Sequence, residues 1–249
     1  GKKAVVICVA FFKGGVTKTT TTMTLAQGLS LLGHKVLSID MDPQGSLTTL
    51  HGLLPDSEID DTETLAPMFH GDHEDVKYAI RKTYWSGIDL IPASSGLFAA
   101  EFTLPSRQMR DPKFEFWNSL NRGLDAVRDE YDVILIDTPP SLSYMTINAF
   151  YAADGIIVPM TASMLDLASS AQFWKLLSEL SAPIEKRNRV KKKYEFINIL
   201  MSKMNHSDAT SNAVRNWISS VYGGKVMATE IPLTAVTGSA ASEFSTVFD

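Results

Sequence analysis

Residues 12–20 of this 249-residue chain read Phe-Lys-Gly-Gly-Val-Thr-Lys-Thr-Thr, which places two lysines in one glycine turn. The apolar run Val5–Phe11 before the turn is typical of a buried strand, and the stretch Lys18–Leu32 after it is helix-like. A helix N-terminus that follows a glycine turn offers backbone N–H groups and a favourable dipole to an anion. The motif therefore predicts a phosphate-binding loop, in which Lys18 reaches the phosphates and the Thr19 hydroxyl binds Mg²⁺.

The strict phosphate-loop pattern is not met, because Phe12 and Thr17 occupy the two positions that normally hold glycine. Thr17 is β-branched and resists positive φ, so the loop must keep ordinary backbone angles there. The alternative interpretation is a plain glycine turn with solvated lysines. Two acidic motifs further along the chain favour the phosphate-binding interpretation.

The first acidic motif follows the short apolar run Val36–Asp40 and continues as Met-Asp-Pro-Gln-Gly. Carboxylates at the carboxyl end of a parallel strand lie where open α/β sheets bind ligands. If the strand continues, Asp40 and Asp42 project the same way, because side chains alternate along a strand. One carboxylate is then near the metal and the other orients the attacking water. An Asx-Pro turn is the alternative, and such a turn would also fix a carboxylate.

The second acidic motif is Asp137, which closes the strand-like run Tyr131–Asp137 and precedes Thr-Pro-Pro. An acid at this place supports Mg²⁺ in phosphoryl-transfer sites. The alternative is a strand-end acid that caps a turn.

Strand-like and helix-like segments alternate along the whole chain, which predicts an α/β fold with a doubly wound, mostly parallel sheet covered by helices on both faces. We expect one domain over residues 1–249, since no repeat or low-complexity linker interrupts the pattern. Further predicted strands are 88–92, 155–160, 196–204 and 226–231, and further predicted helices are 112–130, a segment after 160 and 212–221.

Composition is that of an ordinary globular protein, with 45% hydrophobic and 20% charged residues and a net charge of −5. Cys8 is the only cysteine and is predicted to be a core residue, since it can neither form an internal disulfide nor supply a cysteine pair for a metal cluster. No apolar run is long enough to span a membrane. These features predict a cytoplasmic protein.

Basic residues concentrate between positions 186 and 193, in contrast to the acidic overall charge. The cluster, which we call the basic run, consists of Lys186, Arg187, Arg189, Lys191, Lys192 and Lys193. Arg215 is a candidate for the same surface. Such a patch is able to bind the phosphates of double-stranded DNA through counterion release. A solvated loop is the alternative.

The pattern Lys13-Gly14-Gly15-x-x-Lys18-Thr19, together with the two acidic motifs, resembles the deviant Walker A box of the ParA/MinD ATPases. The resemblance extends over nearly the whole chain and is strongest to ParA proteins of the SopA type. The Asp-Pro-Gln that follows Met41 favours ParA over MinD. The matching stretches are Lys13–Thr20, Val36–Ser46, Tyr131–Leu142, Asn148–Pro159 and Ile231-Pro232.

The resemblance implies a P-loop ATPase fold with ATP and Mg²⁺ as ligands. It implies that Lys13 reaches the partner's nucleotide across a dimer interface, that Asp42 lies near the attacking water with Asp40 as the next candidate, and that Thr19 and Asp137 serve the metal. The implied ATP-binding residues are Lys13, Gly14, Gly15, Val16, Thr17, Lys18, Thr19 and Thr20.

The resemblance also implies a DNA-segregation ATPase. In that function an ATP-driven homodimer binds DNA non-specifically, associates with the nucleoid and is released when a ParB-type partner stimulates slow hydrolysis. The helix-turn-helix region that precedes the ATPase domain of SopA-type relatives is not found, and a shortened C-terminus is expected. The alternative is a membrane-cycling ATPase of the MinD kind, which would need a terminal amphipathic helix; none is visible, so no membrane partner is expected.

Overall fold

The computed structural model describes most of the chain, and every element below lies in that part. The described residues are 3–10, 16–161, 167–189, 192–202, 216 and 233–236. The strands among them are β1 (Val5–Val9), β2 (Val36–Asp40), β3 (Arg81–Lys82), β4 (Ile88–Ile91), β5 (Val133–Asp137), β6 (Gly155–Thr161), β7 (Phe196–Ser202) and β8 (Leu233–Val236).

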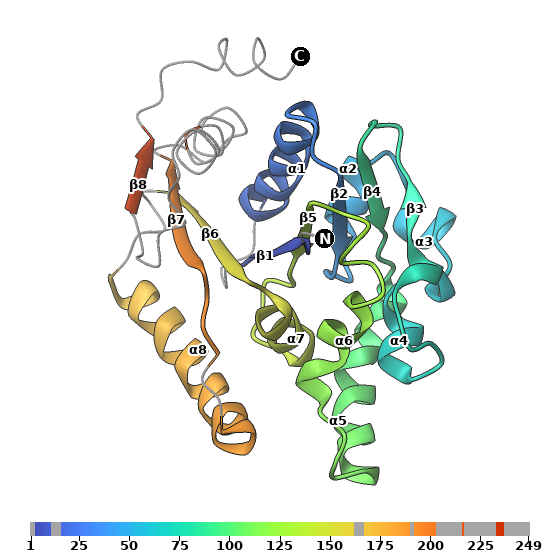
Figure 1. The fold of residues 1–249 in the computed structure, drawn as a ribbon, viewed down its shortest axis with the longest axis vertical. Coiled ribbons are helices and arrows are strands. Elements are labelled where there is room, and N and C mark those ends of the chain that lie inside the picture. Colours follow the sequence, from blue (N-terminus) through green and yellow to red (C-terminus); the bar gives the residue numbers. More distant parts are fainter. Residues whose placement is uncertain are drawn as a thin grey trace.

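These strands form one sheet in the order β3-β4-β2-β5-β1-β6-β7-β8 (Figure 1). Neighbouring strands are parallel throughout, except that β3 pairs antiparallel with β4 at the edge. The central strands β2 and β5 are fully buried and nearly continuous in apolar residues until each ends on an aspartate, as strands covered on both faces require. The predicted doubly wound, mostly parallel sheet is therefore confirmed.

Helices connect the parallel strands. In the described residues, no helix has the length and apolar character needed to cross a membrane. The α-helices are α1 (Val16–Leu31), α2 (Ser46–Leu50), α3 (Pro55–Glu58), α4 (Ala66–His70), α5 (Ala100–Arg110), α6 (Ser119–Leu124), α7 (Tyr144–Ala152) and α8 (Leu167–Asn188). Short 3₁₀ helices are Asp61–Glu63, Lys77–Ala79, Ser95–Ala99 and Phe116–Asn118.

The helices lie on both faces of the sheet (Figure 1). On one face α1 contributes Leu25 and Leu29 to the core, and on the other face α5, α6 and α7 contribute Leu104, Leu124 and Ala149. Successive residues of each strand supply the two cores in turn, because strand side chains alternate between the faces. Burial of this kind stabilises the fold by roughly 1.5–3 kcal/mol for each large apolar side chain.

Cys8 lies in β1 and is fully buried in the larger of these cores. Burial raises the pKa of its thiol far above the usual value, so the sulfur stays protonated and unreactive. The prediction that Cys8 is a core residue is confirmed.

The helix predicted over 112–130 is wrong as a continuous element. The structure has a 3₁₀ helix at Phe116–Asn118, then α6, and then turns that lead into β5. The apolar residues of the stripe, Trp117, Leu120, Leu124 and Val127, are nevertheless buried. Their spacing therefore predicted burial correctly, but α6 ends directly after Gly123 because glycine is a poor helix former.

Two other predicted elements lie mostly outside the described residues. Of the helix predicted over 212–221, only Asn216 is described, and it is helical. The strand predicted over 226–231 falls outside, whereas the parallel strand β8 follows a little later.

Candidate functional site

The candidate site lies at the carboxyl edge of the sheet, where β1, β2 and β5 end close to the beginning of α1 (Figure 1). Asp40 and Asp137 are register partners between β2 and β5, and Val9 of β1 is the partner of Asp137 on its other side. Because α1 begins at Val16, Lys18 lies in its first turn. The parallel register thus brings together three motifs that are far apart in the sequence.

Lys18 and Asp137 form a buried ion pair. Lys18 Nζ donates to Asp137 Oδ1 at 2.7 Å, and the two side chains are only 5% and 0% exposed. Thr19 Oγ1 donates to Asp137 Oδ2 at 3.0 Å, so both carboxylate oxygens accept hydrogen bonds. The ammonium, the hydroxyl and the carboxylate are thereby held next to one another at the start of α1.

Asp42 lies in a turn beyond β2. The strand ends at Asp40, so the condition under which Asp40 and Asp42 project the same way does not hold. Instead, the N–H of Gln44 donates to Asp42 Oδ1 at 3.0 Å, and the N–H of Gly45 donates to the Asp42 carbonyl at 2.9 Å. This is the Asx-type turn of the alternative interpretation. It fixes the carboxylate, whose pKa is raised mainly by burial.

Asp40 is held entirely by protein groups. Its Oδ1 accepts the N–H of Asp42 at 3.1 Å, and its Oδ2 accepts both the N–H and the hydroxyl of Thr48, at 2.9 and 2.7 Å. Burial, reinforced by repulsion from Asp137, raises the pKa of Asp40 to about 7. Asp40 is thus fully buried and is bonded to the backbone N–H groups of Asp42 and Thr48.

A cavity of about 510 Å³ opens between these groups, which is within the usual range for small-molecule sites. It is lined by Lys18, Thr19, Asp42, Gln44, Ser46, Thr49, Leu50 and Pro140. Lys18, Thr19 and Asp42 were predicted as site residues, whereas Gln44, Ser46, Thr49, Leu50 and Pro140 were not. The signal for these five is that they lie in the two acidic motifs or shortly after them.

The donor set fits a nucleotide with its magnesium ion. Magnesium prefers oxygen ligands and is usually held by one or two carboxylates together with substrate phosphates. The Thr19 hydroxyl and the Asp137 carboxylate are such groups, and the Lys18 ammonium beside them is a strong donor for phosphate oxygens.

The remaining predicted nucleotide residues are only partly described. Lys13, Gly14 and Gly15 lie outside the described residues. Val16 and Thr17 form the beginning of α1, although only their backbone is described, and Thr20 is half-buried in the same helix.

The basic run lies where α8 ends and β7 begins, at the amino edge of the sheet and therefore opposite the cavity. Lys191 and Arg215 lie outside the described residues. Lys186, Arg187, Arg189 and Lys193 are exposed, and Lys192 is half-buried.

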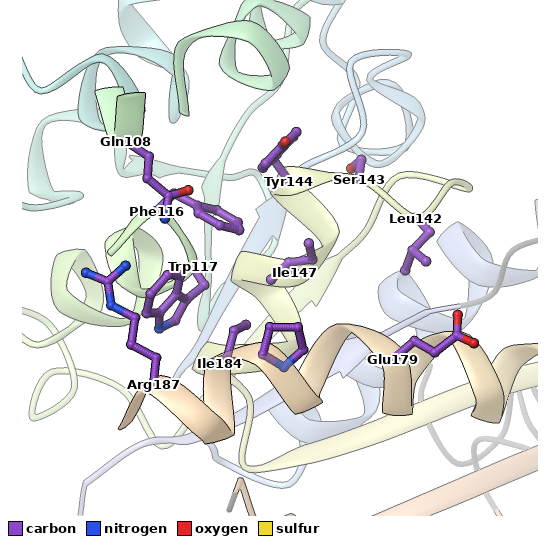
Figure 2. Close-up of a pocket in the computed structure, with 11 residues that line it drawn as sticks. Gln108, Phe116, Trp117, Leu142, Ser143, Tyr144, Ile147, Glu179, Ile184 and Arg187 are labelled. Carbon is purple, nitrogen blue, oxygen red and sulfur yellow. The ribbon is translucent and has the colours of Figure 1, made fainter. Parts of the chain in front are cut away.

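Two members of the basic run make contacts within the fold. Figure 2 shows Arg187 of α8 beside Trp117, with 5.0 Å between the guanidinium carbon and the ring centroid. Arg187 also donates to the Pro112 carbonyl at 2.8 Å. The Lys192 ammonium lies 5.7 and 5.5 Å from the ring centroids of Tyr151 and Tyr194, and burial lowers its pKa. Among the described members of the basic run, the exposed bases Lys186, Arg189 and Lys193 remain predicted candidates for DNA contact, and the predictions for Lys191 and Arg215 stay untested.

Comparison with known proteins agrees with this architecture. A family model described as an AAA domain matches residues 4–191. The chromosome partitioning protein ParA of Caulobacter vibrioides is 31% identical over 229 residues, which cover 91% of this chain and 80% of that protein. The chain belongs to the ParA family.

This ParA-family chain is also similar to the SopA protein of Escherichia coli K12, at 34% identity over 251 residues. The match covers 98% of the chain but only 63% of SopA. Among solved structures, cobyrinic acid a,c-diamide synthase from Mycobacterium smegmatis with a bound ATP analogue and magnesium matches with a TM-score of 0.67 and 30% identity, over 88% of this chain and 83% of that one.

Proposed function

We propose that this ParA-family chain is an ATP-dependent DNA-segregation ATPase, and that residues 1–249 act as one ATPase domain. The observation that carries the proposal is that Lys18, Thr19 and Asp42 line one cavity at the carboxyl edge of the sheet, and that the buried Asp137 carboxylate holds Lys18 and Thr19 there. The relative named chromosome partitioning protein ParA supports a role in partition.

Each group has a separate task in phosphoryl transfer, which depends mainly on positioning and charge neutralisation. Lys18 binds the β- and γ-phosphates, and Thr19 with Asp137 holds Mg²⁺, which neutralises phosphate charge. Asp42 orients the attacking water from its turn. Asp40 fixes the backbone of that turn and does not face the nucleotide.

The ATP state is proposed to be a homodimer in which Lys13 reaches the partner's nucleotide. The dimer doubles the exposed basic surface formed by Lys186, Arg189 and Lys193, so it binds DNA much more tightly than a monomer does. Hydrolysis, slow in the free protein and stimulated by a ParB-type partner, returns the protein to the weakly binding state. The protein is cytoplasmic and associates with the nucleoid while ATP is bound.

The test is Mg²⁺-dependent ATP hydrolysis by the purified protein, compared with Asp42→Ala. The wild type is expected to hydrolyse ATP slowly, and the variant to bind ATP but to hydrolyse it at least about 100-fold more slowly, as is typical when a positioned acid–base group is removed. Equal rates would contradict the role of Asp42. Binding to lipid vesicles with ATP, without binding to DNA, would favour the membrane-cycling alternative.

A further inference from the structure

The hydroxyl of Thr48 joins three parts of the candidate site. Thr48 lies in α2, directly after the Asp42 turn, and is fully buried. Its Oγ1 donates to Asp40 Oδ2 at 2.7 Å and accepts the N–H of Ala93 at 2.9 Å. Ala93 follows the end of β4, which is the neighbour of β2 in the sheet. One hydroxyl group therefore links α2, the end of β2 and the end of β4.

Asp40 carries this connection on to Asp42. One oxygen of the Asp40 carboxylate is held by the N–H and the hydroxyl of Thr48, and the other accepts the N–H of Asp42 at 3.1 Å. The carboxylate thus connects Asp42, at the start of the turn, to Thr48 in α2, which follows the turn. If the Thr48 hydroxyl is removed, Asp40 loses its shortest hydrogen bond, and only the Thr48 N–H still holds Oδ2. The Asp40 carboxylate then holds the Asp42 backbone in a less fixed orientation.

The phosphate-binding groups are held in a different way. Lys18 and Thr19 both donate to Asp137, which receives no hydrogen bond from Thr48 or Asp40 in the contacts of the described residues. Thr48 also does not line the cavity, whereas its neighbour Thr49 does. A change at Thr48 should therefore displace the Asp42 carboxylate while leaving Lys18 and Thr19 in place.

We propose that Thr48 is a positioning residue for ATP hydrolysis, which acts through Asp40 to set the orientation of Asp42. The inference rests on the proposed function, because it requires that Asp42 orients the attacking water. It assigns to Thr48 a task in the hydrolytic step and none in nucleotide binding.

The first test compares Thr48→Val, which keeps the shape of the side chain and loses the hydroxyl, with Thr48→Ser, which keeps the hydroxyl. Thr48→Val should lower kcat about 10- to 100-fold, since a displacement of about 1 Å in a reacting group has an effect of this size. The Kd of Thr48→Val for ATP should differ from the wild-type Kd by less than about threefold. The kcat of Thr48→Ser should also lie within about threefold of the wild-type kcat. Thr103→Val is the matched control, because the Thr103 hydroxyl in α5 donates to the carbonyl of Ala99, the residue directly before that helix, and has no contact with the candidate site in the described residues.

The second test is a double-mutant cycle with Asp42→Ala, read as kcat. If Thr48 acts through Asp42, Thr48→Val should cause no further loss of kcat in the Asp42→Ala protein, because the group that it positions is gone. A merely structural role would lower kcat by the same factor in both backgrounds. If Thr48→Val does not fold, Thr48→Ala takes its place, since it also removes the hydroxyl.

Three results would overturn the inference in a protein whose wild type hydrolyses ATP. These are a folded hydroxyl-less variant with wild-type kcat, an equal loss in both backgrounds, and a Thr48→Ser variant with less than about a tenth of the wild-type kcat. A wild type that binds ATP and does not hydrolyse it would instead contradict the proposed function.

Discussion

The buried ion pair between Lys18 and Asp137 affects both the stability of the fold and the binding of ligand. Burying two charges is costly, and the cost is offset only while the 2.7 Å contact and the accompanying hydrogen bond from Thr19 persist. The same ammonium and carboxylate are the groups that phosphate and Mg²⁺ require. Residues that serve the ligand therefore also stabilise the fold, and substitutions should affect both.

Lys18→Ala should abolish nucleotide binding and also lower the free energy of unfolding by about 3–5 kcal/mol, because Asp137 is left buried without a counter-ion. Binding is measured with a fluorescent ATP analogue and stability by urea denaturation. Lys82→Ala is the control, since Lys82 also pairs with an aspartate, Asp89, but its side chain is 82% exposed. The control should cost less than about 1 kcal/mol and bind nucleotide normally. Normal nucleotide binding by Lys18→Ala would contradict the assignment.

Asp40 should make the stability of the ligand-free protein depend on pH. Its pKa in the folded protein is raised to about 7, mainly by burial. The folded state therefore holds a proton that the unfolded state releases at a lower pH, and stability is lost as pH rises through the folded pKa. Between about pH 5 and pH 8, the wild type should lose more unfolding free energy than Asp40→Asn, measured by urea denaturation without nucleotide or Mg²⁺. Parallel pH profiles would show that Asp40 does not titrate in this range.

At the scale of elements, sequence patterns located the strands better than the helices. The strand predicted over Val36–Asp40 has the same boundaries as β2. A buried parallel strand is mostly apolar, and this one ends at its first charged residue, Asp40. The segment 112–130 was wrongly predicted to be one helix, because its buried residues keep helical spacing although the helix is interrupted. The two-residue strand β3 carries no periodic signal at all.

The candidate site was predictable to the extent that it depends on local motifs. Lys18, Thr19, Asp42 and Asp137 follow from glycine, lysine and acid spacing at strand ends, and the structure brings them together. Thr48 was not predicted, because its role depends on contacts with Asp40 and Ala93 that only the folded chain creates.

The turn that carries Asp42 depends on Gly45, which has a φ of 68°. A Cβ at this position would lie 2.4 Å from Pro55 Cγ, so Gly45→Ala adds a clash to the backbone strain. We expect a loss of stability beyond the roughly 1–2 kcal/mol of left-handed strain, together with slower ATP hydrolysis, because the clash displaces Asp42. Urea denaturation and an ATPase assay measure the two effects.

The control Gly52→Ala separates the effect of backbone strain from the effect of the steric clash with Pro55. Gly52 has a φ of 81° but no atom within 4 Å of the added Cβ. This control should lose only about 1–2 kcal/mol and keep its ATPase rate. If Gly45→Ala and Gly52→Ala behaved alike in both assays, the contact with Pro55 would have no part in holding the Asp42 turn.

At the scale of the whole molecule, the cavity and the basic run lie at opposite edges of the sheet. DNA is therefore proposed to bind away from the nucleotide, with ATP acting on DNA affinity through dimerisation rather than through direct contact. Any DNA binding should be independent of sequence and steeply weakened by salt, since it relies on phosphate contacts.

The double variant Lys186→Ala/Lys193→Ala should weaken DNA binding equally on unrelated sequences and flatten its salt dependence, without changing ATP-dependent dimerisation. Fluorescence anisotropy at several salt concentrations measures both effects. Lys77→Ala/Lys82→Ala is the control, because it removes the same charge. Lys82 lies in β3, which is at the opposite end of the strand order from β7, and Lys77 lies in the short 3₁₀ helix before β3. Equal losses in the two double variants would mean that net charge, and not the basic run, governs DNA binding.

The most direct test of the account is sedimentation velocity of the wild type and Lys13→Gln, each with Mg²⁺ and either ATP or ADP. The slowly hydrolysing variant Asp42→Ala serves as the ATP-state reference. The account predicts a dimer for the wild type and Asp42→Ala with ATP only, and a monomer for Lys13→Gln with either nucleotide although it still binds ADP. The same dimer for Lys13→Gln with ATP, or the same species for the wild type with ATP and ADP, would contradict an ATP-driven dimer completed by Lys13.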